Sequence, residues 1–261
     1  MEATGEILGS NIELFWLSFI GATLIALVHL LMPHFRFMRQ PGNPWVPVSA
    51  GVALAYVFMD IFPHLAKIQL KLSDVIENNV YGFLTHNVYL VCLIGFSVYL
   101  GIFILVNRYR ASQILSDISF GSAPIPIKIE YVSLVAYSFL IGYLLSEQAT
   151  HRPEPVLLFA TAMAIHFMGI DGLLFKLVPN LYGRSMRFML AASVYIGWLT
   201  GAMLEITDAT LALWYAFLAG GLIVVATVNE LSSIRSRGQY GAFIVGAGVF
   251  SALILSIERF G

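Results

Sequence analysis

The run FLTHNVYLVCLIGFSVYLGIFILV, residues 83–106, decides the fold class because it contains no Asp, Glu, Lys or Arg. A helix of about 20 predominantly apolar residues spans the hydrocarbon core of a bilayer. The run is continuously apolar and lacks the alternation of a membrane β-strand, so a helix is the remaining way to satisfy its backbone in lipid. We therefore expect a transmembrane helix here, and similar runs extend that expectation to the whole chain.

Eight windows qualify as spans. They are residues 14–32, 45–65, 83–106, 131–148, 156–178, 186–204, 211–230 and 240–257. The chain is 59% hydrophobic and 11% charged, with a mean hydropathy of +0.83, whereas soluble domains carry about 25% charged residues. We expect an all-α membrane protein, a single polytopic domain over residues 1–261 whose main partner is the lipid bilayer.

Charge and cysteine content exclude two further classes. The formal net charge of −1 argues against a nucleic-acid partner. The single cysteine, Cys92, excludes a disulfide framework and a cysteine-based zinc site. The acidic N-terminal stretch MEATGEILGSNIELF lacks the basic start and the cleavage site of a signal peptide, so we expect none to be removed.

Basic residues are distributed unevenly over the expected connections. Ten follow the first, third, fifth and seventh windows: Arg36, Arg39, Arg108, Arg110, Lys128, Lys176, Arg184, Arg187, Arg235 and Arg237. The other side holds four: Lys67, Lys71, Arg152 and Arg259. The positive-inside rule then places both termini on the extracytoplasmic side of the membrane.

An internal repeat links the second and seventh windows. Gly51-VALAYVFM-Asp60 matches Gly221-LIVVATVN-Glu230 in the separation between glycine and carboxylate. The expected topology sends these two segments across the membrane in opposite directions. Matching segments of opposite direction are typical of an inverted-repeat transporter, although such matches also arise by chance in apolar sequence.

Asp60 and His64 form a candidate ion-binding pair in the second window. They are four residues apart and share a helix face, so they could bind one ion together. Pro63 between them removes a backbone donor and predicts a kink that frees a carbonyl oxygen. The alternative interpretation is an interfacial pair that contacts headgroups and water.

His166 and Asp171 are the deepest candidates, in the fifth window. A charge at the bilayer centre costs about 2.5–3.5 kcal/mol on insertion scales, so an intramembrane carboxylate indicates function. The two residues are five apart, about 140° around an ideal helix, and one site could use both only after a distortion that Gly169 and Gly172 would permit. His166 alone could equally be a hydrogen-bonded core residue.

The other polar candidates lie nearer the helix ends, where an interfacial position is the alternative. They are Glu147 in the fourth window and Asn229 and Glu230 in the seventh. Four further histidines, His29, His34, His86 and His151, are interpreted as interfacial. A GxxxG face formed by Gly197 and Gly201 predicts close helix packing and permits a homodimer.

Three of these segments resemble motifs of the ZIP (Zrt- and Irt-like) family of divalent-metal transporters. GVALAYVFMDIFPHL resembles the second-helix motif, a Gly-rich run ending in His-x-x-Pro-Glu, with Asp60 at the His position and His64 at the Glu position. AIHFMGIDGLLFKL resembles the fifth-helix motif, with His166 at its first His and Asp171 in place of its later acid. AGGLIVVATVNELSSI resembles the seventh helix, where an aspartate commonly stands at the position of Asn229.

The resemblance implies an eight-helix bundle with both termini outside, which transports a divalent cation such as zinc, manganese or iron by alternating access. His166 and Asp171 would then be central ligands, with Asp60 and His64 collecting the ion and Glu230 assisting its release. Asn229 and Glu147 complete the candidate ligand set. No resident cofactor and no enzymatic activity are expected.

The fourth-helix motif His-Asn-x-x-Asp-Gly departs most from the family. The segment YSFLIG places Tyr137, Ser138 and Ile141 at the ligand positions and keeps only Gly142. This departure supports an alternative, a non-transporting scaffold or regulatory subunit of a larger membrane complex. A third hypothesis, an intramembrane metal hydrolase, would use Asp60, His64 and His166 around zinc, but no H-E-x-x-H pair supports it.

Overall fold

The computed structural model describes residues 2–40, 42–72, 80–112, 123–148, 153–204, 206–230 and 236–260, and these residues form helices and connections without strands. The α-helices are α1 (Glu2–Leu31), α2 (Trp45–Tyr56), α3 (Phe62–Leu72), α4 (Val80–His86), α5 (Val88–Ser112), α6 (Ile125–Gln148), α7 (Pro153–Leu177), α8 (Arg184–Met203), α9 (Asp208–Val224) and α10 (Arg237–Phe260). Two 3₁₀ turns, η1 (Met32–His34) and η2 (Arg36–Arg39), follow α1. Two π-helical segments, η3 (Val57–Ile61) and η4 (Val225–Glu230), interrupt or extend longer helices.

Within the described residues, seven helices are long and apolar enough to cross a membrane. They are residues 12–34, 45–70, 88–110, 125–148, 156–176, 208–228 and 237–257. The chain is therefore a multi-pass helical membrane protein, as its composition predicts. The remaining expected span, the sixth window at residues 186–204, coincides with the 20-residue helix α8. This helix does not qualify as a span by its composition, so the eight-span layout stays a prediction.

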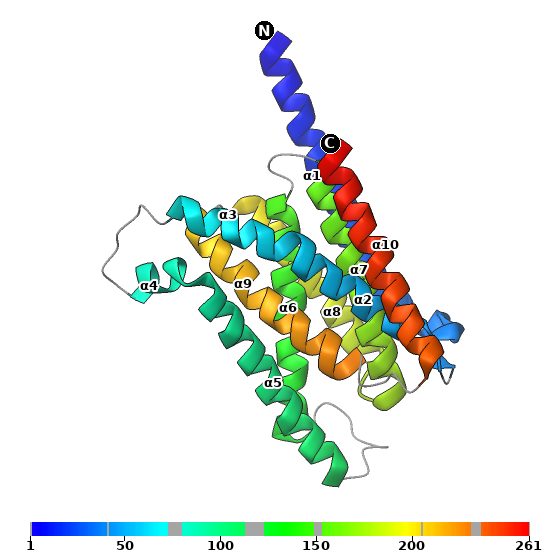
Figure 1. The fold of residues 1–261 in the computed structure, drawn as a ribbon. Coiled ribbons are helices and arrows are strands. Elements are labelled where there is room, and N and C mark those ends of the chain that lie inside the picture. Colours follow the sequence, from blue (N-terminus) through cyan, green and yellow to red (C-terminus); the bar gives the residue numbers. More distant parts are fainter. Residues whose placement is uncertain are drawn as a thin grey trace.

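Helix α7 lies at the centre of the bundle and is the most buried of the seven spans, whereas α10 is the most exposed. Helix α7 packs against α1 and α2, while α6 packs against α8. Helix α2 packs against α10, and α9 packs against α5. Both chain ends lie at the same end of the bundle (Figure 1). We call this the outer end and the opposite one the inner end, after the orientation predicted from the charges.

Glycines allow the backbones of two helix pairs to touch. A methyl group at Gly51 on α2 would overlap the backbone of α10, and one at Gly246 on α10 would overlap α2. The second pair repeats the arrangement, because a methyl group at Gly220 on α9 would overlap α5 and one at Gly95 on α5 would overlap α9. Small residues commonly mediate such close approach between membrane helices.

The predicted GxxxG face is used inside the chain. A methyl group at Gly197 would overlap the Phe139 carbonyl oxygen on α6, and one at Gly201 would lie 2.8 Å from the Tyr143 carbonyl oxygen. Gly142 on α6 approaches α8 equally closely. This face holds α8 against α6 and is not free to form a homodimer.

The distortion predicted in the second span takes the form of a π-helical segment. In η3, the backbone N–H of Phe62 bonds to the carbonyl of Val57, five residues earlier. Pro63 follows directly and has no N–H to continue the ordinary α-helical ladder. Single π-turns of this kind often occur at functional sites, and this one carries Asp60.

Candidate functional site

A polar cluster surrounds Tyr215 near the outer end of the bundle. Tyr215 lies on α9, is buried, and is within electrostatic reach of both Asp60 on η3 and Glu147 on α6. The His64 ring on α3 packs edge-on against the Tyr215 ring, with the centroids 5.6 Å apart. Three of the predicted site residues are therefore gathered around one phenol, which we call the outer cluster.

Phenols support both carboxylates of the outer cluster. Tyr56, one helical turn before Asp60, hydrogen-bonds to it. Tyr143, one turn before Glu147, lies within hydrogen-bonding reach of that carboxylate and also donates to the Leu204 carbonyl at 2.7 Å. Both carboxylates are half-buried, so they lie close to the bundle surface.

Tyr137 and His166 meet in the middle of the bundle. The Tyr137 Oη lies 3.2 Å from the His166 Nε2, and both residues are buried. Tyr137, Ser138 and Ile141, which stand at the fourth-helix ligand positions, are all buried with them. A phenol and a hydroxyl are weak neutral ligands, so His166 is the strongest metal ligand of this centre.

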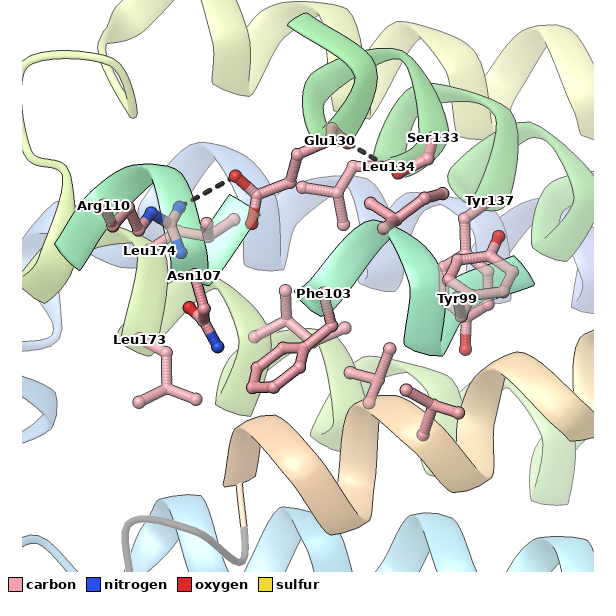
Figure 2. Close-up of a pocket in the computed structure, with 14 residues that line it drawn as sticks. Tyr99, Phe103, Asn107, Arg110, Glu130, Ser133, Leu134, Tyr137, Leu173 and Leu174 are labelled. Atoms are coloured by element: carbon pink, nitrogen blue, oxygen red, sulfur yellow. Dashed lines mark hydrogen bonds and ion pairs between the residues drawn. The ribbon is translucent and has the colours of Figure 1, made fainter. Parts of the chain in front are cut away.

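A cavity of about 180 Å³ lies between α5, α6, α7 and the junction of α9 with η4 (Figure 2). Apolar side chains of α7 and α9 form one wall. Tyr99 and Tyr137 line the part nearest the centre, and their rings pack with centroids 5.5 Å apart. The polar residues Asn107, Arg110, Glu130 and Ser133 line the inner part.

An ion pair stands in this inner part of the cavity. The Arg110 guanidinium on α5 bonds to the Glu130 carboxylate on α6 at 2.8 Å, and the two side chains are 19% and 23% exposed. Neither residue was expected from sequence to belong to a site. The fourth window starts at residue 131, whereas α6 begins at Ile125, so Glu130 was placed outside the membrane span.

A buried His–Asp pair lies against a different face of α7. The His29 Nδ1 on α1 is 2.7 Å from the Asp171 Oδ2 on α7, and the side chains are 0% and 1% exposed. Phe167 packs edge-on against the His29 ring at 4.5 Å. The interpretation of His29 as interfacial is therefore wrong, because its ring is fully enclosed and paired with a buried carboxylate.

Tyr182 borders this buried pair from the connection between α7 and α8. Its hydroxyl lies 3.5 Å from the His29 carbonyl oxygen. Burial, reinforced by the neighbouring Asp171, raises the pKa of the Tyr182 phenol far above its usual range. Tyr182 therefore remains a protonated hydrogen-bond donor beside the pair.

His166 and Asp171 contact different helices. His166 meets Tyr137 of α6, whereas Asp171 pairs with His29 of α1. Helix α7 is continuous from Pro153 to Leu177, so the distortion that would bring the two residues into one site does not occur. The separation of about 140° given by ideal helix geometry explains this arrangement.

The remaining predicted residues are only partly described. Asn229 and Glu230 belong by their backbone to η4, and their side chains lie outside the described part of the structure. His34 is exposed, the His86 Nδ1 lies 2.7 Å from the Gly82 carbonyl oxygen, and His151 lies outside the described residues. In the part of the chain that the structure describes, no three His, Cys, Asp or Glu side chains are grouped closely enough to hold a metal ion.

No protein-family model matches the chain, and no curated protein matches its sequence. The fold and the positions of its polar groups define a multi-pass helical membrane protein with an outer cluster, a central imidazole and an inner cavity. The proposed function is based on these three features.

Proposed function

We propose that the chain is a ZIP-like membrane transporter of a divalent metal cation, of the zinc, manganese or iron class, working by alternating access. Helix α6 contributes to all three levels of the suggested route, through Glu147 at the outer cluster, Tyr137 at the centre and Glu130 in the cavity. Seventeen residues separate the two carboxylates, about 25 Å along a helix. That length approaches the hydrocarbon thickness of about 30 Å.

The observation that carries this proposal is the difference between the two halves of the route. The cavity occupies the inner half and ends at Tyr137, next to His166. Between Tyr137 and Glu147, the side chains of Ile141, Leu144 and Leu145 are completely buried. A route with one hollow half and one packed half is what a transporter presents when it faces one side of the membrane.

The packing of the outer helices supports an inverted repeat. Helix α2 meets α10 through Gly51 and Gly246, and α9 meets α5 through Gly220 and Gly95. An exchange of the first three spans with the last three replaces α2 by α9 and α10 by α5. It therefore converts the α2–α10 pair into the α9–α5 pair. Each repeat also carries one π-helical segment, η3 or η4. Interrupted helices at corresponding positions of two halves are typical of transporters with inverted repeats.

The proposed roles follow the three levels. Asp60, His64 and Glu147 attract the ion at the outer end, which we predict from the basic-residue distribution to lie outside the cytoplasm. His166 is the central ligand. Carboxylates favour harder ions such as Mn²⁺, and imidazoles suit Zn²⁺ as well. Asn229 and Glu230 remain proposed ligands at the inner end of the seventh span, whereas we assign Asp171 to holding α1 against α7.

The test is metal uptake into proteoliposomes, with Zn²⁺, Mn²⁺, Fe²⁺ and Cd²⁺ screened separately. Saturable uptake is expected, and Glu147→Gln should lower its kcat/KM by about tenfold or more, because it removes one unit charge from the outer cluster. Glu13→Gln is the matched control, since Glu13 is an exposed carboxylate on α1. Absence of uptake for every ion from folded protein would overturn the proposal.

A non-transporting scaffold is the second candidate. It is favoured by the lack of a three-ligand group among the described residues and by Tyr137, Ser138 and Ile141 at the ligand positions. Metal-independent, stable association with a larger membrane complex, without uptake by any ion, is its expected result. A zinc hydrolase would need three protein ligands and one open position, which the described residues do not bring together.

A further inference from the structure

Two helix faces enclose the inner cavity. On α5, Tyr99, Phe103, Asn107 and Arg110 recur at intervals of three or four residues and therefore share one face. Figure 2 shows this face opposite the one on α6 that carries Glu130. The side chains change from phenols near the centre to charged groups at the inner part. Glu130 is the carboxylate among the residues that line this cavity.

The Arg110–Glu130 pair is incompletely satisfied. The guanidinium bonds to the carboxylate through one nitrogen, Nη2. The buried Arg110 Nε has no hydrogen-bond partner among the described residues. Arginine binds a carboxylate most strongly through two parallel hydrogen bonds. A guanidinium held by one such bond, beside open cavity volume, can be displaced without breaking a larger network.

Oxygen atoms around Glu130 suit a hard cation. The Ser133 hydroxyl donates its proton to the Glu130 carbonyl oxygen at 2.7 Å, which leaves its oxygen lone pairs available. Asn107 lines the same part of the cavity and adds an amide oxygen. Carboxylate, amide and hydroxyl oxygens are the ligands that Mg²⁺, Ca²⁺ and Mn²⁺ prefer.

We propose that Glu130, Asn107 and Ser133 form an inner cation-binding subsite and that Arg110 is a tethered cation that occupies this subsite when the route is empty. A divalent ion carries twice the charge of the guanidinium, so its arrival repels Arg110 from Glu130. When the ion leaves, Arg110 returns and prevents an uncompensated carboxylate from remaining in the cavity. The competition keeps the affinity of the subsite low and favours release. This inference rests on the proposed transport route.

Mn²⁺ binding to the purified full-length chain tests the subsite directly, measured by loss of the free-ion signal in electron paramagnetic resonance. Arg110→Gln should tighten Mn²⁺ binding by about tenfold or more, because a competing unit charge at contact distance is removed. The gain should disappear in the double variant Arg110→Gln/Glu130→Gln. Arg110→Lys keeps the charge and should bind as the wild type does. Arg108→Gln, an exposed residue of the same helix, should also leave binding unchanged.

Three results would overturn the subsite. Arg110→Gln could be monodisperse and bind Mn²⁺ as the wild type does, or its gain could persist in the double variant. If Arg110→Gln does not fold, Glu130→Gln is compared with the wild type at saturating Mn²⁺, and an equal number of bound ions refutes the proposal. Uptake by wild-type proteoliposomes separates the two proposals. Tighter Mn²⁺ binding by Arg110→Gln without any uptake retains the subsite and rejects transport. Uptake without tighter binding by Arg110→Gln retains transport and rejects the subsite.

Discussion

The His29–Asp171 and Arg110–Glu130 pairs have almost the same length but lie in different surroundings. His29 and Asp171 are 2.7 Å apart and at most 1% exposed, whereas Arg110 and Glu130 are 2.8 Å apart and about one-fifth exposed beside a cavity. Removing one partner of an enclosed pair leaves a buried polar group that nothing can solvate, whereas water or ions can replace a partner in a pair that is partly exposed. The first pair therefore holds α1 to α7, and the second is able to exchange its cation.

The largest expected effect is on stability and comes from His29→Leu. This substitution leaves the Asp171 carboxylate buried without its imidazole, and removing one partner of a buried pair costs about 3–5 kcal/mol. Thermal unfolding of the purified protein in detergent measures the loss. The double variant His29→Leu/Asp171→Leu should recover most of it, since apolar residues can replace a buried pair at little cost. If His29→Leu is as stable as the wild type, the conclusion that this pair holds α1 against α7 is wrong.

Asp171→Asn should lower the stability less than His29→Leu does. It also tests whether the His29–Asp171 pair has a role in uptake. The amide keeps the shape of the carboxylate but weakens the bond to His29, at a cost of about 1–3 kcal/mol. Uptake should persist with an unchanged KM, because Asp171 pairs with α1 instead of lining the cavity. Loss of uptake from folded Asp171→Asn protein would return Asp171 to the role of central ligand that the sequence suggested.

The helices could be predicted from the sequence more completely than the polar contacts between them. Long apolar runs fix the spans because lipid offers the backbone no other partner. The expected fourth span starts at residue 131, whereas α6 starts at Ile125 and holds Pro126 in its first turn, where proline is tolerated. That error of six residues removed Glu130 from the candidate site.

The pairing of His29 with Asp171 could not be derived from a single sequence. The two residues are 142 positions apart, and only the packing of α1 on α7 brings them together. Helix periodicity did indicate that His166 and Asp171 face different ways. It could not indicate which helices they would meet, because that depends on how the whole bundle packs.

Arg110→Gln should cost little stability. The Arg110–Glu130 pair is about one-fifth exposed beside a cavity and the His29–Asp171 pair is enclosed, so the melting temperature should change by less than in His29→Leu. Arg108→Gln, an exposed residue two positions earlier, is the control for the loss of one positive charge on α5. A loss for Arg110→Gln equal to that of His29→Leu would show that both pairs are structural and would remove the contrast between them.

Salt provides the smallest and most selective effect. The Debye length falls from about 10 Å at 0.1 M to about 3 Å at 1 M ionic strength, and this screening acts on charges that ions can approach. The stability difference between the wild type and Arg110→Gln should therefore shrink in 1 M NaCl. The difference between the wild type and His29→Leu should stay constant, because the enclosed pair admits no ions. Equal salt responses would mean that both pairs meet the same solvent, and the exchange of Arg110 for a cation would then lose its physical basis.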